Sequence, residues 1–194
     1  MDKKWDMVFD LDDTIISGGR TIMNLYNHIY GTNHQVDYKN LQWDFRPYLK
    51  TEEETQKALD LFLHEDFYNP KFLVVFDNII DIINTLTNMG NKIAICSKQH
   101  PLRRPHTLKW VKKTMPKVEV LFSDDFHNKN EVISSCRIFY DDRIEALDGM
   151  KDCADLCVCV GNYNWNKEWT GARQDSEKWY EIKIIIDLYK FLKG

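Results

Sequence analysis

The chain has 194 residues, enough for one substantial hydrophobic core with at most a small insertion. Hydrophobic residues make up 43% and charged residues 29% of it, and no apolar run is long enough to span a bilayer, so we expect a soluble globular protein and no membrane partner. The formal net charge of −4 argues against broad electrostatic contact with a nucleic acid backbone, and no stable nucleic acid binding is expected.

The first predicted element is a buried strand that ends in carboxylates. The apolar residues Val8 and Phe9 lead directly into Asp10, Leu11 and Asp12. Because alternate side chains of a strand share a face, Asp10 and Asp12 are expected to converge at the carboxyl edge of a parallel sheet, where α/β proteins bind ligands. Such a pair suits a hard cation such as Mg²⁺, and an aspartate beside the ion can attack phosphorus as a covalent nucleophile.

The next segment, up to about residue 70, is rich in Asn, Tyr, His and Glu and has no strand-like apolar run. Apolar residues at helical spacing predict a helix over residues 21–29. Thr51 and Glu54 form a capping box ahead of a second apolar helical pattern. This segment is therefore interpreted as a small helical cap inserted after the first strand.

The remaining chain alternates between predicted strands and helices, and this alternation indicates an α/β fold with a parallel sheet. A polar, aromatic loop is expected over residues 161–175. The predicted strands cover residues 92–96, 118–122, 137–140 and 156–160, and the predicted helices cover residues 77–89, 107–115 and 176–193.

The five cysteines are interpreted mainly as reduced core residues, and the N-terminal residues 1–6 lack the apolar segment of a signal peptide. A cytoplasmic location is therefore expected. The grouping of Cys153, Cys157 and Cys159 suggests a zinc site as an alternative, but Cys157 and Cys159 share a strand face and no second ligand pair follows at the usual spacing.

Polar groups follow three separate strands. Asp10 and Asp12 follow the first, Ser97 follows the strand over residues 92–96, and Asp141 and Asp142 follow the strand over residues 137–140. An acidic pair after one strand is equally well explained as a turn or a helix cap. The recurrence at three strand ends favours a single site at one edge of the sheet.

These residues resemble the motifs of the haloacid dehalogenase (HAD) superfamily of phosphatases. The first motif, Asp-x-Asp-x-Thr after a strand, corresponds to residues 10–14; the second, Ser or Thr after a strand, to Ser97; and the fourth, an acidic pair, to Asp141 and Asp142. The resemblance implies a Rossmann-like core formed by residues 1–16 and 71–194, with a helical cap over residues 17–70.

A finer resemblance is to the 5'(3')-deoxyribonucleotidase family, and it extends over nearly the full chain. It is carried by Trp43-Asp44-Phe45, Phe67-Tyr68-Asn69-Pro70, Asp141-Asp142-Arg143, Asn162-Tyr163-Asn164 and Trp179-Tyr180-Glu181-Ile182. Two positions depart from that family. Asp13 stands where Gly is usual, and Ser17-Gly18-Gly19 stands where an aromatic residue commonly contacts the base.

The resemblance implies that Asp10 is a nucleophile that forms a phosphoaspartate, and that Asp12 first protonates the leaving alkoxide and then activates water. It also implies that Mg²⁺ is held by Asp10, the backbone carbonyl of Asp12 and Asp141, with Asp142 supporting the site. The ion would neutralise charge between the anionic carboxylate and the anionic phosphate.

The phosphate oxygens are expected to contact Ser97 and a lysine, since donors placed in advance stabilise the transition state. Lys129 occupies the place of the third-motif lysine in the deoxyribonucleotidase pattern and is favoured. Lys109 is the second choice, and Lys98 would add a backbone amide or a charge. A solvated surface position is the alternative for any one of these lysines.

Trp43 and Phe45 are the candidate residues for stacking on a nucleobase, with packing in the core of the cap as the alternative. The sequence thus predicts a Mg²⁺-dependent phosphatase that hydrolyses (deoxy)ribonucleoside monophosphates, and a small-molecule nucleotide is its expected partner. The alternatives are a phosphatase that acts on a nucleic acid 3'-phosphate or on another small phosphomonoester, and a non-catalytic, receiver-like module that binds Mg²⁺ and phosphate. Assembly as a homodimer is left open.

Overall fold

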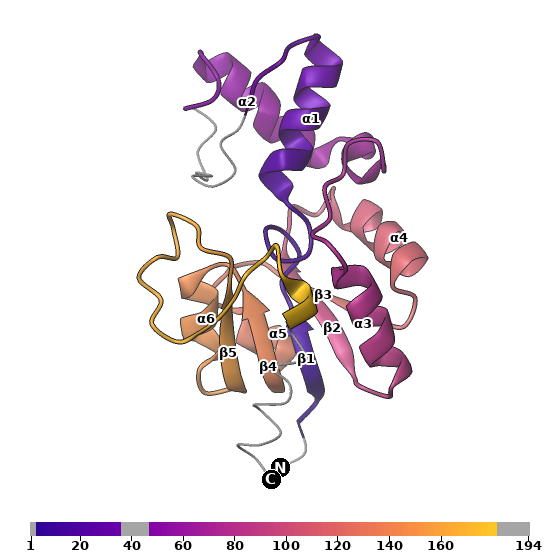
Figure 1. The fold of residues 1–194 in the computed structure, drawn as a ribbon, viewed down its shortest axis with the longest axis vertical. Helices are drawn as coiled ribbons and strands as arrows, with labels where there is room; N and C mark the ends of the chain where they lie inside the picture. The colour runs from indigo at the N-terminus through magenta and orange to yellow at the C-terminus, as the bar shows by residue number, and fades with distance from the viewer. Residues whose placement is uncertain (1–2, 36–46, 182–194) are drawn as a thin grey trace.

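A computed structural model describes residues 3–35 and 47–181. Its centre is a six-stranded sheet in the order β3-β2-β1-β4-β5-β6, and every neighbouring pair of strands is parallel (Figure 1). This confirms the α/β class expected from the alternation of strands and helices. The strands are β1 (Trp5–Phe9), β2 (Ile93–Lys98), β3 (Glu119–Ser123), β4 (Cys136–Asp141), β5 (Ala154–Val160) and β6 (Ala172–Gln174).

Helices cover both faces of this sheet and the upper end of the molecule in Figure 1. The α-helices are α1 (Gly18–Tyr30), α2 (Glu52–Asp60), α3 (Ile79–Asn88), α4 (Arg104–Thr114), α5 (Lys129–Ile133) and α6 (Ile144–Met150). The 3-10 helices are η2 (Leu61–Leu63), η3 (Glu65–Tyr68) and η4 (Trp179–Glu181). Among the described residues, no helix combines the length and the apolar character that crossing a bilayer requires.

Alternation along the strands divides the core into two apolar layers. Val8 and Phe139 face one layer together with apolar residues of α5 and α6. Phe9 and Tyr140 face the other layer together with residues of α3 and α4, and their rings stack with centroids 4.6 Å apart. Trp179 of η4 packs against both of these rings edge-on, at 5.9 and 5.7 Å. The central strands β1 and β4 are therefore buried on both sides.

Two sequence predictions need correction near the C-terminus. The segment over residues 161–175 is not loop throughout, because residues 172–174 form β6 and pair with β5. The helix predicted over residues 176–193 does not begin at Ser176, since a turn precedes the short 3-10 helix η4. The remainder of that prediction lies outside the described residues.

The described part of residues 17–70 is helical, as predicted. Thr51 and Glu54 form both hydrogen bonds of a capping box at the start of α2. The two segments that connect this helical region to the sheet run antiparallel to each other: Ser17 N donates to Val74 O at 2.9 Å and Phe76 N donates to Ile15 O at 3.0 Å. In Figure 1, α1 and α2 lie above the sheet beyond these connections.

Candidate active site

Asp10 and Asp141 are brought together by the pairing of the two central strands. Phe9 is the register partner of Tyr140, so the residues that follow, Asp10 and Asp141, lie side by side on the same face of the sheet. The backbone amide of Asp10 donates to the carbonyl oxygen of Tyr140 at 2.8 Å, so the two segments stay paired beyond the end of β1. Two carboxylates that are 131 positions apart in the sequence therefore meet at the carboxyl edge of the sheet.

Asp142 joins them to form a cluster of three buried carboxylates. Ligand oxygens of Asp10, Asp141 and Asp142 lie within 4.8 Å of one another, and the three residues are only 6%, 0% and 2% exposed. Among the described residues this is the one such group with the spacing of a metal site. Several carboxylate oxygens with no sulfur or nitrogen donor suit a hard divalent cation such as Mg²⁺.

Lys129 contacts two of the three carboxylates of this cluster. It is the first residue of α5 and is fully buried, and its Nζ donates to Asp10 Oδ1 at 2.5 Å and to Asp141 Oδ2 at 2.6 Å. Burial alone would lower the pKa of the Lys129 ammonium, but the two carboxylates raise it above its ordinary value. A buried cation is tolerated here because two anions compensate its lost hydration.

The carboxylates themselves are crowded. Burial raises the pKa of Asp10 to about 7, and Lys129 opposes that shift while Asp141 and Asp12 add to it. Burial also raises the pKa of Asp142 well above its ordinary value, and the neighbouring Asp141 and Asp10 act in the same direction. A divalent cation among these groups would favour their charged forms.

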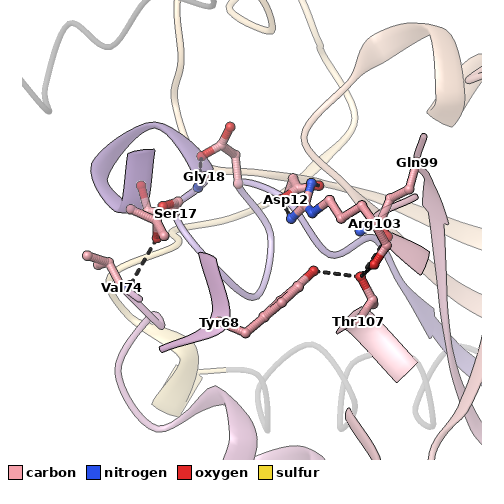
Figure 2. A network of polar contacts seen from close by, with 10 residues as sticks. Asp12, Ser17, Gly18, Tyr68, Val74, Gln99, Arg103 and Thr107 are labelled. Atoms are coloured by element: carbon pink, nitrogen blue, oxygen red, sulfur yellow. Dashed lines mark hydrogen bonds and ion pairs between the residues drawn. The ribbon is translucent and has the colours of Figure 1, made fainter. Parts of the chain in front are cut away.

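Asp12 forms an ion pair with Arg103. The two terminal nitrogens of Arg103 donate to Asp12 Oδ2 at 2.8 Å and to Asp12 Oδ1 at 2.7 Å, so both carboxylate oxygens are bound. Figure 2 shows the Arg103 side chain extending toward Asp12 from the segment that follows β2. A bidentate pair of this kind fixes the rotation as well as the position of the carboxylate. Sequence reasoning did not single out Arg103.

Arg103 is enclosed by aromatic rings of the helical region. Its guanidinium carbon lies 4.2 Å from the ring centroid of Phe67, 5.2 Å from that of Phe62 and 5.5 Å from that of Tyr68. The Tyr68 hydroxyl lies 2.7 Å from Thr107 Oγ1 on α4, a contact that Figure 2 also shows. The ion pair of Arg103 with Asp12 therefore lies where the cap segment meets the core.

The backbone conformation explains why Asp13 can stand where the similar family usually has Gly. Its backbone has φ of 54°, in the left-handed region where glycine is unstrained and where Asp and Asn are the other residues most often found. The Asp13 carboxylate accepts a hydrogen bond from the backbone amide of Gly18 at 3.1 Å. Burial raises the pKa of this carboxyl to about 7, with a further contribution from Asp12.

The other predicted site residues differ in their surroundings. Ser97 is buried near the end of β2, which extends two residues further than predicted. Lys98 is exposed, with its Nζ 5.0 Å from the ring centroid of Phe126, and Lys109 is exposed on α4. The structure therefore brings Lys129 to the acidic cluster, whereas the side chains of Lys98 and Lys109 face solvent.

Trp43 and Phe45, the candidate base-stacking residues, lie outside the described residues, so their stacking role stays a prediction. A different aromatic residue reaches the acidic cluster. Trp165, in the loop after β5, donates its indole N–H to Asp142 Oδ2 at 2.7 Å. Its neighbours Asn162, Tyr163 and Asn164 carry part of the family resemblance, which was the signal available for this loop.

No protein-family model matches this sequence, and no functionally curated protein matches it either. Solved structures do match. A HAD hydrolase of family IA, variant 3, from Entamoeba histolytica is 13% identical with a TM-score of 0.57, and the match covers 96% of this chain and 99% of that chain. A protein from Lactobacillus delbrueckii subsp. bulgaricus, proposed to be a phosphoglycolate phosphatase, is 18% identical with a TM-score of 0.57, with 93% and 98% covered.

A β-phosphoglucomutase from Clostridium difficile is 15% identical with a TM-score of 0.55, and the match covers 96% of this chain and 97% of that chain. These similarities extend over nearly the whole length of each protein. The chain therefore has the Rossmann-like α/β fold that HAD-superfamily hydrolases share.

Proposed function

We propose that this protein is a Mg²⁺-dependent phosphatase of the HAD superfamily that hydrolyses small phosphomonoesters through a phosphoaspartate on Asp10. The observation that carries the proposal is the buried contact of Lys129 with both Asp10 and Asp141, next to Asp142, at the carboxyl edge of the parallel sheet. The solved structures of the same fold include one named as a HAD hydrolase and one named as a phosphoglucomutase, which supports phosphoryl chemistry.

The charge of the cluster supports a divalent cation. When ionised, the three carboxylates carry three negative charges and Lys129 carries one positive charge, which leaves two negative charges in a site that is almost closed to water. Asp10, Asp141 and Asp142 would hold Mg²⁺, with the backbone carbonyl of Asp12 as an expected further ligand. When bound, Mg²⁺ would reduce the repulsion between the substrate phosphate and the carboxylates and orient the phosphate for in-line attack.

Each residue then has a chemical task. Asp10 attacks phosphorus and forms an acyl phosphate, while the P–O bond to the alcohol breaks and Asp12 gives its proton to the departing oxygen. Water then attacks the same phosphorus, Asp12 accepts the water proton, and the Asp10 carboxylate is released with inorganic phosphate. Lys129, and Ser97 from β2, would donate to the phosphate oxygens as negative charge develops on them.

A nucleoside monophosphate, in particular a deoxyribonucleotide, is the substrate that we propose within this class. The support is the ordered resemblance to deoxyribonucleotidases along the chain, from Trp43 in the cap to Trp179 near the C-terminus. We also propose a cytoplasmic location, which agrees with the finding that all five cysteines are free thiols.

Phosphate release from a panel of phosphomonoesters tests the proposal. Purified protein with Mg²⁺ is assayed on deoxyribonucleoside and ribonucleoside 5'- and 3'-monophosphates, sugar phosphates, p-nitrophenyl phosphate and a 3'-phosphorylated oligonucleotide. Sustained turnover of mononucleotides is expected. Turnover of sugar phosphates alone would refute the substrate class and keep the chemistry, while a single stoichiometric phosphorylation without turnover would favour a receiver-like module.

Asp10→Asn is the matched variant for this assay, because it removes the nucleophile with almost no change in volume. Turnover is expected to fall at least about a thousandfold, since an amide oxygen is a poor nucleophile toward a phosphate ester. A circular dichroism spectrum and a melting temperature recorded for both proteins show whether the fold is kept. Near-normal turnover by Asp10→Asn would contradict the assignment of the nucleophile.

A further inference from the structure

The loop of residues 161–171, between β5 and β6, contacts the acidic cluster from outside. Trp165 donates its indole N–H to Asp142 Oδ2 at 2.7 Å, and the Trp165 ring stacks on Tyr163 with centroids 4.5 Å apart and planes 13° apart. An indole N–H can donate a hydrogen bond but cannot accept one. Its partner here must therefore be an acceptor such as a carboxylate oxygen.

The backbone of this loop is held by a second set of hydrogen bonds. Asn166 is fully buried, and its side-chain amide donates to the backbone oxygen of Asp142 at 2.9 Å. The guanidinium group of Arg173, on β6, donates to the backbone oxygens of Gly161 at 2.8 Å, Asn166 at 2.7 Å and Trp169 at 3.0 Å. Asn166 thus ties the middle of the loop to the segment after β4 that carries Asp142, and Arg173 ties the start and the end of the loop to β6.

The position of Tyr163 is also determined. Gly161 has φ of 73°, and a Cβ atom at this position would overlap the Tyr163 ring, so both the turn and the ring packing require glycine. The Tyr163 hydroxyl donates to the backbone oxygen of Asp13 at 3.2 Å. Tyr163 thus connects the loop to the segment after β1, and Trp165 stacks on a ring that is fixed at both ends.

We propose that Trp165 is a positioning residue for the metal site: its N–H fixes the rotation of the Asp142 carboxylate and so raises the affinity of the acidic cluster for a divalent cation. This inference rests on the proposed function, because it assumes that the cluster binds Mg²⁺. The N–H occupies Oδ2 of Asp142 and leaves Oδ1 available to a cation. Hydrogen-bond partners of metal ligands typically contribute about 10-fold to 100-fold in metal affinity.

Trp165→Phe is the direct test, because phenylalanine keeps a ring that can stack on Tyr163 and removes the N–H. Trp169→Phe is the matched control. Trp169 belongs to the same loop, but its indole donates to the backbone oxygen of Ala172 at 3.0 Å and not to a carboxylate of the cluster. Both variants therefore lose one indole donor from the same loop, and the loss reaches Asp142 in only one of them.

The measurement is the binding of Mn²⁺ to the full chain without substrate, followed by the electron paramagnetic resonance signal of the free ion and repeated with Mg²⁺ as competitor. The dissociation constant of Trp165→Phe is expected to rise at least about tenfold over wild type, while that of Trp169→Phe stays close to wild type. Melting temperatures in EDTA are recorded for all three proteins.

Each outcome has a distinct meaning. Equal affinities of wild type and Trp165→Phe would overturn the inference and leave the proposed function standing. Absence of Mn²⁺ and Mg²⁺ binding by the wild-type protein would overturn both. An equal loss of affinity in Trp165→Phe and Trp169→Phe would attribute the effect to the loop as a whole and would also overturn the inference.

If Trp165→Phe does not fold, Tyr163→Leu replaces it. This variant keeps the indole N–H and removes the ring on which Trp165 stacks. The inference then requires weaker Mn²⁺ binding than that of Trp169→Phe. Equal affinity of these two variants would overturn it.

Discussion

Replacing Lys129 with methionine tests the buried charge cluster. The Lys129 side chain is 1% exposed, and the carboxylates that it contacts belong to side chains that are 9% exposed at Asp10 and 0% exposed at Asp141. Methionine has a similar length but no charge, so both carboxylates would remain buried without their cation. Removing one partner of a buried ion pair typically costs about 3–5 kcal/mol, and we expect a loss of this size in the free energy of unfolding.

The assay is urea unfolding in EDTA, followed by circular dichroism at several pH values. A carboxyl group whose pKa is higher in the folded than in the unfolded protein binds more protons when folded, so it lowers stability as the pH rises. Burial raises the pKa of Asp10 to about 7 in the native protein, and loss of Lys129 removes the charge that opposes this shift. The unfolded-state pKa is the same in both proteins and cancels, so the deficit of Lys129→Met should be largest well above pH 7 and shrink as the pH falls through about 7.

Lys98→Met is the control, because Lys98 is an exposed lysine on the neighbouring strand β2. Its free energy of unfolding should stay within about 0.5 kcal/mol of wild type at every pH. A loss below about 1 kcal/mol for Lys129→Met would be in the range of an exposed ion pair. That result, or a deficit that does not depend on pH, would refute the description of a dry ammonium held between two carboxylates.

Three further predictions concern the metal, Arg103 and α2. EDTA should abolish turnover, and added Mg²⁺ should restore it. In urea titrations, Mg²⁺ at about 100 times its dissociation constant should add about 2.7 kcal/mol to the free energy of unfolding. Arg103→Met should lower kcat about a hundredfold for alkyl phosphates and less for p-nitrophenyl phosphate, because Asp12 loses the partner that orients it. Arg104→Met is the control, since Arg104 pairs with an exposed acid. An equal loss of kcat in both variants would argue against this role of Arg103. Thr51→Ala should cost about 1 kcal/mol in urea unfolding, because the capping box with Glu54 is lost, and unchanged stability would mean that α2 does not depend on its cap.

The sequence predicted the sheet because buried parallel strands are recognisable as short runs of apolar residues. The strands β1, β2 and β4 are nearly continuous apolar runs, as expected for strands covered on both faces. Once the strands are parallel, polar residues at their carboxyl ends must share one edge of the sheet. The convergence of Asp10 with Asp141 could therefore be predicted, although their register could not.

Two features that the sequence did not predict, the strand β6 and the burial of Arg103, are determined by tertiary contacts. The three residues of β6 show no alternation of apolar and polar side chains. They form a strand because their backbone pairs with the edge of β5. Arg103 lies among several basic residues, yet it is buried because Asp12, 91 positions away, accepts hydrogen bonds from both of its terminal nitrogens. Sequence alone does not show such a partner, since nothing local distinguishes Arg103 from Arg104.

The pairing of β1 with β4 has a consequence for how the site forms during folding. Residues 5–9 must wait for residues 136–141 before Asp10 acquires its neighbour, and Lys129 is added to the chain only shortly before β4. Contacts so distant in sequence are slow to form because a long loop must close first. A nascent chain that stops before β4 would therefore have no ion-binding centre, and metal affinity would report completion of the central sheet.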